Sequence, residues 1–121
     1  MSEQRIKSFE EFWPFYLSQH AHPLCRKLHF VGTTLALGSV AAALSTGQLW
    51  MLAGAPLAGY GFAWVGHFII EKNRPATFTY PLWSLQGDAV MWWKMLTRTL
   101  EADLERFGIS WPPQEHSLRA V

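Results

Sequence analysis

Four of the five histidines of this chain lie close to the two ends of one long apolar stretch. His20, His22 and His29 stand at its entrance, and His67 stands near its exit. Imidazole nitrogen is a common ligand of iron, zinc and copper in proteins. If the stretch folds back on itself, both ends emerge on one side, and we expect these four side chains to form a metal site there. The fifth, His116 in the C-terminal tail, is not part of this prediction.

Carboxylates near the histidines complete the predicted site. His67 and Glu71 are four residues apart and are therefore neighbours on one helix face. We expect Glu71 either to bind the metal or to orient His67 through a hydrogen bond. Asp88 is a further acidic candidate, because the loop before it would bring it to the site.

The spacing of His22 and His29 requires a break in the chain between them. Along a continuous helix these two residues would lie about 10 Å apart, which is too far to share one metal ion. A residue before proline is disfavoured in helical geometry, so Pro23 predicts that His22 is extended or caps the next helix. Such a break lets His20 and His22 turn back over the helix end.

The stretch between the histidines has the composition of a membrane hairpin. From Leu28 to Ile70 it contains no Asp, Glu, Lys or Arg. Residues 28–45 predict one transmembrane helix of about 27 Å, residues 46–48 a turn, and residues 49–70 a second transmembrane helix. An antiparallel hairpin would place His29 and His67 at a similar depth. The alternative is a helical hairpin buried inside a water-soluble domain.

Two amphipathic segments flank the hairpin. Residues 8–19 predict an interfacial helix that starts with the capping pair Ser8 and Glu11, and Pro14 should kink this helix or end it early. Residues 88–107 predict an amphipathic helix that ends at Gly108. The predicted fold is all-α: a single membrane domain over residues 1–121, built as a small integral membrane helical bundle with a two-helix transmembrane hairpin and flanking amphipathic helices.

Composition and charge narrow the class of protein. Of the 121 residues 50% are hydrophobic and 16% charged, and the net charge is +1. Because there is no basic patch, we expect no nucleic-acid partner. Basic residues precede and follow the hairpin and are absent from its turn, so the positive-inside rule places both termini in the cytoplasm. The oligomeric state stays open, a homo-oligomer included.

Two motifs resemble those of a known family. The stretch FYLSQHAHPLCRKLHFVGTT and, above all, VGHFIIEKNRPA are similar to the fungal 2-hydroxy-fatty-acid dioxygenase family of the endoplasmic reticulum. The shared pattern is a histidine three residues before a proline, another six residues after it, and a later Gly-His pair followed by Glu-Lys-x-Arg-Pro-Ala. It covers roughly residues 12–90, and the matching residues are His20, Pro23, His29, Gly66, His67 and the segment 71–76.

The resemblance implies an Fe(II)-dependent integral membrane enzyme, and the family's bacterial relatives imply a bacterial inner membrane. Such an enzyme uses dioxygen to shorten a 2-hydroxy fatty acid by one carbon, a step of fatty-acid α-oxidation. Membrane lipid, a fatty-acid-type substrate and dioxygen are the implied partners. His20, His29 and His67 carry over as catalytic iron ligands. The fungal pattern has a histidine where this chain has Ala21 and none at the position of His22, so the choice between His20 and His22 stays open.

Substrate binding is predicted at two further side chains. Arg74 would pair with the substrate carboxylate, because a guanidinium presents a matching fork of donors. Asp88 is the second candidate. The acyl chain would lie either along the apolar hairpin or among Phe78, Trp92 and Trp93.

Three other functions are compatible with the same residues. His29 and His67 would clamp a haem between them in a small cytochrome or haem carrier. A non-enzymatic membrane protein would use the loop 71–88 to dock a partner, with histidines that only form hydrogen bonds. Structural zinc would need a closed site of four ligands. Whether one or two metal ions bind also stays open.

Overall fold

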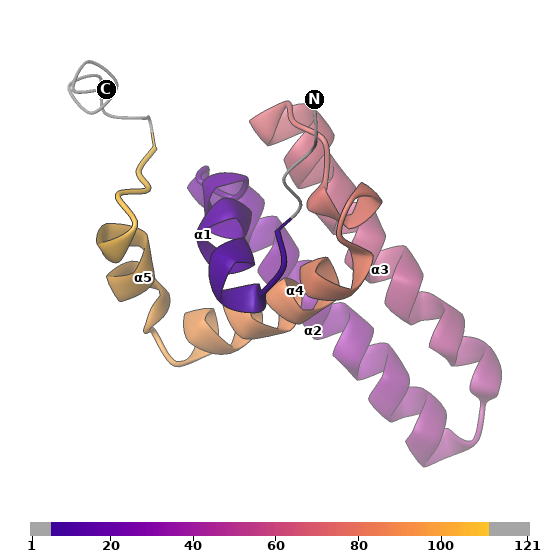
Figure 1. Ribbon diagram of the computed structural model, residues 1–121. Helices are drawn as coiled ribbons and strands as arrows, with labels where there is room; N and C mark the ends of the chain where they lie inside the picture. Colours follow the sequence, from indigo (N-terminus) through magenta and orange to yellow (C-terminus); the bar gives the residue numbers. More distant parts are fainter. Residues whose placement is uncertain (1–5, 112–121) are drawn as a thin grey trace.

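Helices account for the regular structure of residues 6–111, which are the part of the chain that the computed structural model describes (Figure 1). Residues 1–5 and 112–121 lie outside that part, and with them both ends of the predicted 1–121 domain and His116. For the described residues the predicted all-α fold is confirmed. The helices, with η1 and η3 of the 3-10 type and η2 a π-helix, are α1 (Phe9–Ser18), α2 (Pro23–Thr46), η1 (Leu49–Ala53), α3 (Gly54–Trp64), η2 (Val65–Glu71), η3 (Ala76–Phe78), α4 (Pro81–Leu96) and α5 (Leu100–Arg106).

Helices α2 and α3 lie side by side as an antiparallel hairpin whose turn projects away from α1, α4 and α5 (Figure 1). Gly47 ends α2 in the left-handed region (φ +75°), and its N–H donates to the Ala43 carbonyl at 2.9 Å. The predicted turn at 46–48 is therefore confirmed. Gly32 allows the two helices to approach closely, because a Cβ at this position would lie 3.0 Å from the Ala58 carbonyl oxygen.

The observed limbs of the hairpin differ from the two predicted spans. The first helix starts at Pro23 rather than at residue 28, because His22 caps it and a proline at the first position needs no N–H partner. The second limb was predicted as one helix over 49–70, and it is divided into η1, α3 and η2. Pro56 has no N–H for the carbonyl four residues earlier, and the turn that precedes it is a 3-10 helix.

One helix of residues 6–111, α2, is long and apolar enough to cross a membrane. Only 17% of its most apolar window is buried inside the protein. Large apolar side chains are also exposed on the second limb, among them Leu57, Phe68 and Ile69. Length and composition therefore support one of the two predicted spans, and the second span stays a prediction.

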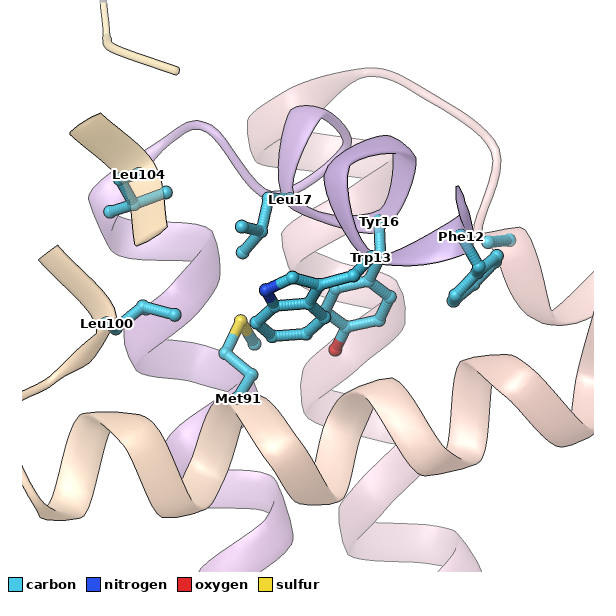
Figure 2. Close-up of a cluster of buried hydrophobic side chains, with 8 residues drawn as sticks. Phe12, Trp13, Tyr16, Leu17, Met91, Leu100 and Leu104 are labelled. Atoms are coloured by element: carbon cyan, nitrogen blue, oxygen red, sulfur yellow. The ribbon is translucent and has the colours of Figure 1, made fainter. Parts of the chain in front are cut away.

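The apolar face of α1 packs onto α4 and α5. The indole Nε1 of Trp13 donates to Asp103 Oδ2 at 2.7 Å and joins α1 to α5. Ser8 caps the helix as predicted, because its hydroxyl accepts the Glu11 N–H at 3.2 Å. Figure 2 shows the cluster that results, in which the labelled members are Phe12, Trp13, Tyr16 and Leu17 of α1, Met91 of α4, and Leu100 and Leu104 of α5; Ala76 completes it.

Pro14 was expected to kink this first helix or to end it early; the early end does not occur, and the kink stays a prediction. The helix continues past Pro14 to Ser18. A proline inside a helix removes one backbone hydrogen bond. Here two buried side chains before Pro14 and two after it, those of Phe12, Trp13, Tyr16 and Leu17, stabilise the helix by packing. The placement of this helix at a membrane interface stays a prediction.

The prediction of one amphipathic helix over residues 88–107 is also wrong. Helix α4 starts earlier, with Pro81 at its first position, and ends at Leu96. Arg98 has a left-handed backbone (φ +63°), and the Thr99 N–H donates to the Lys94 carbonyl at 2.8 Å, the hydrogen bond of a Schellman motif. This turn redirects the chain so that α5 packs against α1. Gly108 ends α5 in the same left-handed conformation (φ +68°), as predicted.

Candidate metal centre

Three imidazoles meet between α1, α2 and η2. The Nε2 atom of His20 lies 3.1 Å from Nε2 of His29 and 3.0 Å from Nε2 of His67. The rings of His29 and His67 are also close, nearly perpendicular to each other with centroids 4.9 Å apart. At most 5% of the surface of each of these residues is exposed. Candidate ligand atoms of all three lie within 4.8 Å of one another, so the predicted convergence is confirmed for three of the four histidines.

Each ring is fixed by a hydrogen bond from its other nitrogen. The pairs are His20 Nδ1 with the Tyr16 carbonyl (2.7 Å), His29 Nδ1 with the Cys25 carbonyl (2.8 Å), and His67 Nδ1 with Asn73 Oδ1 (2.8 Å). These oxygens can only accept, so Nδ1 of each ring carries the proton and Nε2 carries a lone pair. Three lone pairs therefore point into one small buried space.

The junction between α1 and α2 explains how the first two histidines meet. His20 follows the last turn of α1, and Pro23 opens α2. In the first turn of α2, Arg26 Nη1 donates to the carbonyls of His20 and Ala21, at 2.9 and 2.8 Å. The chain reverses direction here and places the His20 ring against His29, which lies on the second turn of α2.

The π-helix η2 places His67. The backbone carbonyl of His67 accepts two N–H groups, from Lys72 and, at 2.8 Å, from Asn73. Lys72 has a left-handed backbone (φ +60°). This turn returns the Asn73 carboxamide to the His67 ring, while Asn73 Nδ2 donates to the Gln19 carbonyl at 3.2 Å. The sequence interpretation gave Asn73 no role. The signal that could have found it is its position inside the motif Glu-Lys-Asn-Arg-Pro-Ala.

Tyr16 contacts the His20 ring directly, and Asp88 in turn holds Tyr16. The Tyr16 ring stacks on His20 with centroids 4.0 Å apart, and its hydroxyl donates to Asp88 Oδ1. Gly87 makes room for this tyrosine, because a Cβ there would lie 2.8 Å from the ring. Burial raises the pKa of Tyr16 well above its ordinary value and raises the pKa of Asp88 to about 6. Asp88 borders the same small space as the three histidines.

The other predicted site residues lie outside this group of three. His22 caps α2, and its Nδ1 accepts the Leu24 N–H at 3.0 Å. Glu71 Oε2 accepts the His22 backbone N–H at 2.6 Å. Arg74 is exposed, and its guanidinium lies 4.9 Å from the centre of the Phe78 ring. The roles predicted for these three residues in metal or substrate binding stay predictions.

The donor set fits a transition-metal ion. Burial lowers the pKa of His20 well below its ordinary value, and the imidazoles of His29 and His67 lower it further, so this ring is neutral at pH 7. Neutral imidazole nitrogen binds iron, zinc and copper, and two such ligands at about 2.1 Å from one ion lie about 3 Å apart. The shared space has a volume of about 10 Å³, which is room for about one ion or water molecule.

Comparison with known proteins gives one family match. A family model described as 2-hydroxy-palmitic acid dioxygenase Mpo1-like matches residues 6–100. The matched range contains the three converging histidines together with Asn73 and Asp88. No curated protein and no solved structure matches the chain.

Proposed function

The chain belongs to the 2-hydroxy-palmitic acid dioxygenase Mpo1-like family, and from this premise we propose that it is an Fe(II)-dependent dioxygenase of 2-hydroxy fatty acids. The family description supports a dioxygenase that acts on a fatty-acid-type substrate. The observation that carries the proposal is the convergence of three unprotonated Nε2 atoms, from His20, His29 and His67, in one buried space.

We propose iron as the metal, because imidazole nitrogens suit it and because a dioxygenase needs a centre that reacts with dioxygen. Bound iron would supply the one-electron chemistry with dioxygen that amino-acid side chains lack. Three histidine ligands would leave coordination positions for other ligands, whereas structural zinc uses a closed set of four. A space of about 10 Å³ favours a bare ion over haem, which needs a slot for its macrocycle.

The proposed reaction needs no co-reactant other than dioxygen. The bond between C1 and C2 of the 2-hydroxy acid breaks, C1 leaves as carbon dioxide, and C2 becomes the carboxyl carbon of an acid one carbon shorter. The electrons that this oxidation releases reduce dioxygen, whose two atoms end in the new carboxyl group and in water.

The residues around the histidines would hold and orient the reacting groups. The carbonyls of Tyr16 and Cys25 and the carboxamide of Asn73 keep each imidazole in the tautomer with a free Nε2. Asp88 borders the same space, where its carboxylate would accept a hydrogen bond from the 2-hydroxyl group of the substrate. The Tyr16 hydroxyl donates to this carboxylate and would hold it in place.

We place the hairpin of α2 and α3 in a membrane, with both termini in the cytoplasm. The support is the apolar length of α2 and the exposure of large apolar side chains on both limbs. An exposed apolar surface of this extent is typical of contact with lipid or a partner. The substrate would then reach the histidines from the lipid phase.

The test is metal analysis combined with oxygen uptake. We expect the full chain, purified in mild detergent without chelator, to contain iron and to consume dioxygen when 2-hydroxypalmitic acid is added, with an acid one carbon shorter as the product. His29→Ala and His67→Ala should each lose iron and oxygen uptake. Leu44→Ala, which replaces an exposed side chain near the turn, is the matched control and should retain both.

Three results would overturn the proposal. Full iron content and turnover in both histidine variants would remove the assigned ligands. A Soret absorption band in the purified protein would instead identify a haem protein, and metal content near zero would favour the non-enzymatic alternative.

A further inference from the structure

A hollow of about 300 Å³ lies next to the histidine site and extends along the hairpin. Helix α2 contributes His29, Thr33, Ala36 and Leu37, which share one face at helical spacing. Helix α3 contributes a matching face that includes Gly59 and Tyr60. Helix α4, which crosses the hairpin (Figure 1), closes the third side with Leu85, Asp88 and Ala89.

The polarity of this groove changes along its length. His29, Tyr60 and Asp88 border both the groove and the small space between the three histidines, so the two hollows adjoin each other at these residues. Toward the hairpin turn the lining is small or apolar, with Ala36 and Leu37 on the α2 side. A cavity with polar groups at one end and apolar walls beyond fits an amphiphile with a polar head and a hydrocarbon tail.

The dimensions of the groove fit one hydrocarbon chain. From His29 to Leu37 the α2 wall extends for about 12 Å at the usual helical rise. At the level of Ala36 the two helices pack closely, because a Cβ at Gly59 would lie 4.0 Å from the Ala36 Cβ. Both residues line the groove, so small side chains form its surface where the helices meet, and a larger side chain at position 36 would fill it.

The groove is open toward the surroundings of the hairpin. Leu37 on α2 is 49% exposed, and Leu85 on α4 is 63% exposed. Because this rim is apolar and accessible, a chain can enter it sideways from a lipid phase without crossing a polar surface. By contrast Phe78, Trp92 and Trp93, the other place considered for an acyl chain, do not line it.

We infer that this groove binds the acyl chain of the substrate, and that Ala36 and Ala89 determine which chain lengths the protein accepts. The inference rests on the proposed function, because it takes the substrate carboxyl and 2-hydroxyl groups to lie at the histidine end. Ala36 is about 10 Å along the helix from His29, a distance covered by about eight extended carbons with C–C bonds of about 1.5 Å. Longer chains must pass Ala36.

The first experiment measures chain-length preference. Oxygen uptake is recorded with 2-hydroxy acids of eight to sixteen carbons, for the unaltered protein and for Ala36→Phe. We expect the ratio of the sixteen-carbon to the eight-carbon rate to fall by at least about tenfold, the order by which a filled hydrophobic pocket discriminates. The matched control is Ala41→Phe, because Ala41 is exposed on α2 and does not line the groove, and its ratio should not change.

A second variant tests the groove from α4. Ala89 is exposed, so Ala89→Phe adds its ring at the groove wall without displacing a buried side chain. It should shift the same ratio in the same direction, including in the case that Ala36→Phe does not fold. An unchanged ratio in Ala89→Phe, with iron content retained, would overturn the inference and leave the proposed dioxygenase standing.

A third measurement does not depend on activity. Palmitic acid with a photoreactive diazirine at its terminal carbon is cross-linked to the protein in an amphipol, and the labelled residues are identified by mass spectrometry. We expect labels on the groove faces of α2 and α3, and their loss in Ala36→Phe but not in Ala41→Phe. Labels spread over outward residues such as Leu44 and Leu57, unaffected by either change, would contradict the groove. Labels in the groove of a protein without oxygen uptake would retain the acyl site and reject the proposed reaction.

Discussion

The Nε2 atoms of His20 and His67 lie 3.0 Å apart, although 47 residues separate the two side chains. Both rings donate from Nδ1 to oxygen acceptors, so the two facing nitrogens carry lone pairs and no proton. Buried lone pairs repel each other at this distance unless a cation lies between them. The arrangement therefore has a thermodynamic consequence that can be measured.

Removal of metal is expected to lower the unfolding temperature. A ligand that binds only the folded state stabilises it by about 2.7 kcal/mol at 100 times its Kd. The measurement is tryptophan fluorescence on heating, under anaerobic conditions, with Fe(II) or with a chelator. His67→Ala should unfold at the same temperature in both conditions. If Fe(II) raised the unfolding temperature of His67→Ala as much as that of the unaltered protein, the metal would bind elsewhere.

His20 and His22 are expected to respond differently to substitution. His20→Ala should lose metal, because its Nε2 faces the other two ligands. His22→Ala should retain metal and lose about 1 kcal/mol of stability, because it removes the N-cap of α2. His22→Asn supplies another capping side chain and should recover the stability. Loss of metal in His22→Ala, measured by elemental analysis, would make His22 the ligand.

Asn73 is expected to control metal affinity without touching the metal. Its Oδ1 accepts the His67 Nδ1–H, and loss of such a partner lowers metal affinity by about 10–100-fold. Asn73→Ala should show this loss in a competition titration against a chromogenic chelator, whereas Asn73→Asp retains the acceptor and should bind more tightly than the alanine variant. Equal affinities for these two variants would argue against an orienting role.

Gly87 is expected to be intolerant of a methyl group. A Cβ there would lie 2.8 Å from the Tyr16 ring, which in turn stacks on His20. Gly87→Ala should destabilise the protein by about 1–3 kcal/mol, as overpacking does, and should also weaken metal binding. Gly38→Ala is the control, since a Cβ there meets nothing within 4 Å. Similar thermal stability of the two variants would refute the packing argument.

The ionisation of Asp88 is expected to make stability depend on pH. Burial raises its pKa in the folded state to about 6, while the Tyr16 hydroxyl opposes this change. The stability that comes from binding the proton is present at low pH and is lost as the pH rises through 6. Asp88→Asn carries no charge and still offers an acceptor to Tyr16. In metal-free protein, the melting temperature of Asp88→Asn should rise relative to that of the unaltered chain as the pH increases from 5 to 7.5. A constant difference would mean that Asp88 is not perturbed.

Much of this architecture was predictable from the order of residues alone. The charge-free stretch with a glycine turn predicts a helical hairpin, and the hairpin brings His29 and His67 to one end, because antiparallel limbs return to their starting level. Capping chemistry predicts the start of α1 at Ser8 and the end of α5 at Gly108, since these signals act within a few residues of the helix end.

Tertiary structure decided what lies beyond that short range. Helical spacing states which residues share a face, and it does not state the direction of the chain after a break. The break at Pro23 could have turned either His20 or His22 inward; packing of Tyr16 against Gly87 turned His20 inward and left His22 as a cap. Lys72, whose left-handed backbone brings Asn73 to His67, and Arg98, whose left-handed backbone divides the last helix, likewise adopt a conformation that glycine usually supplies. The local sequence disfavours these conformations, and only contacts between distant segments make them stable.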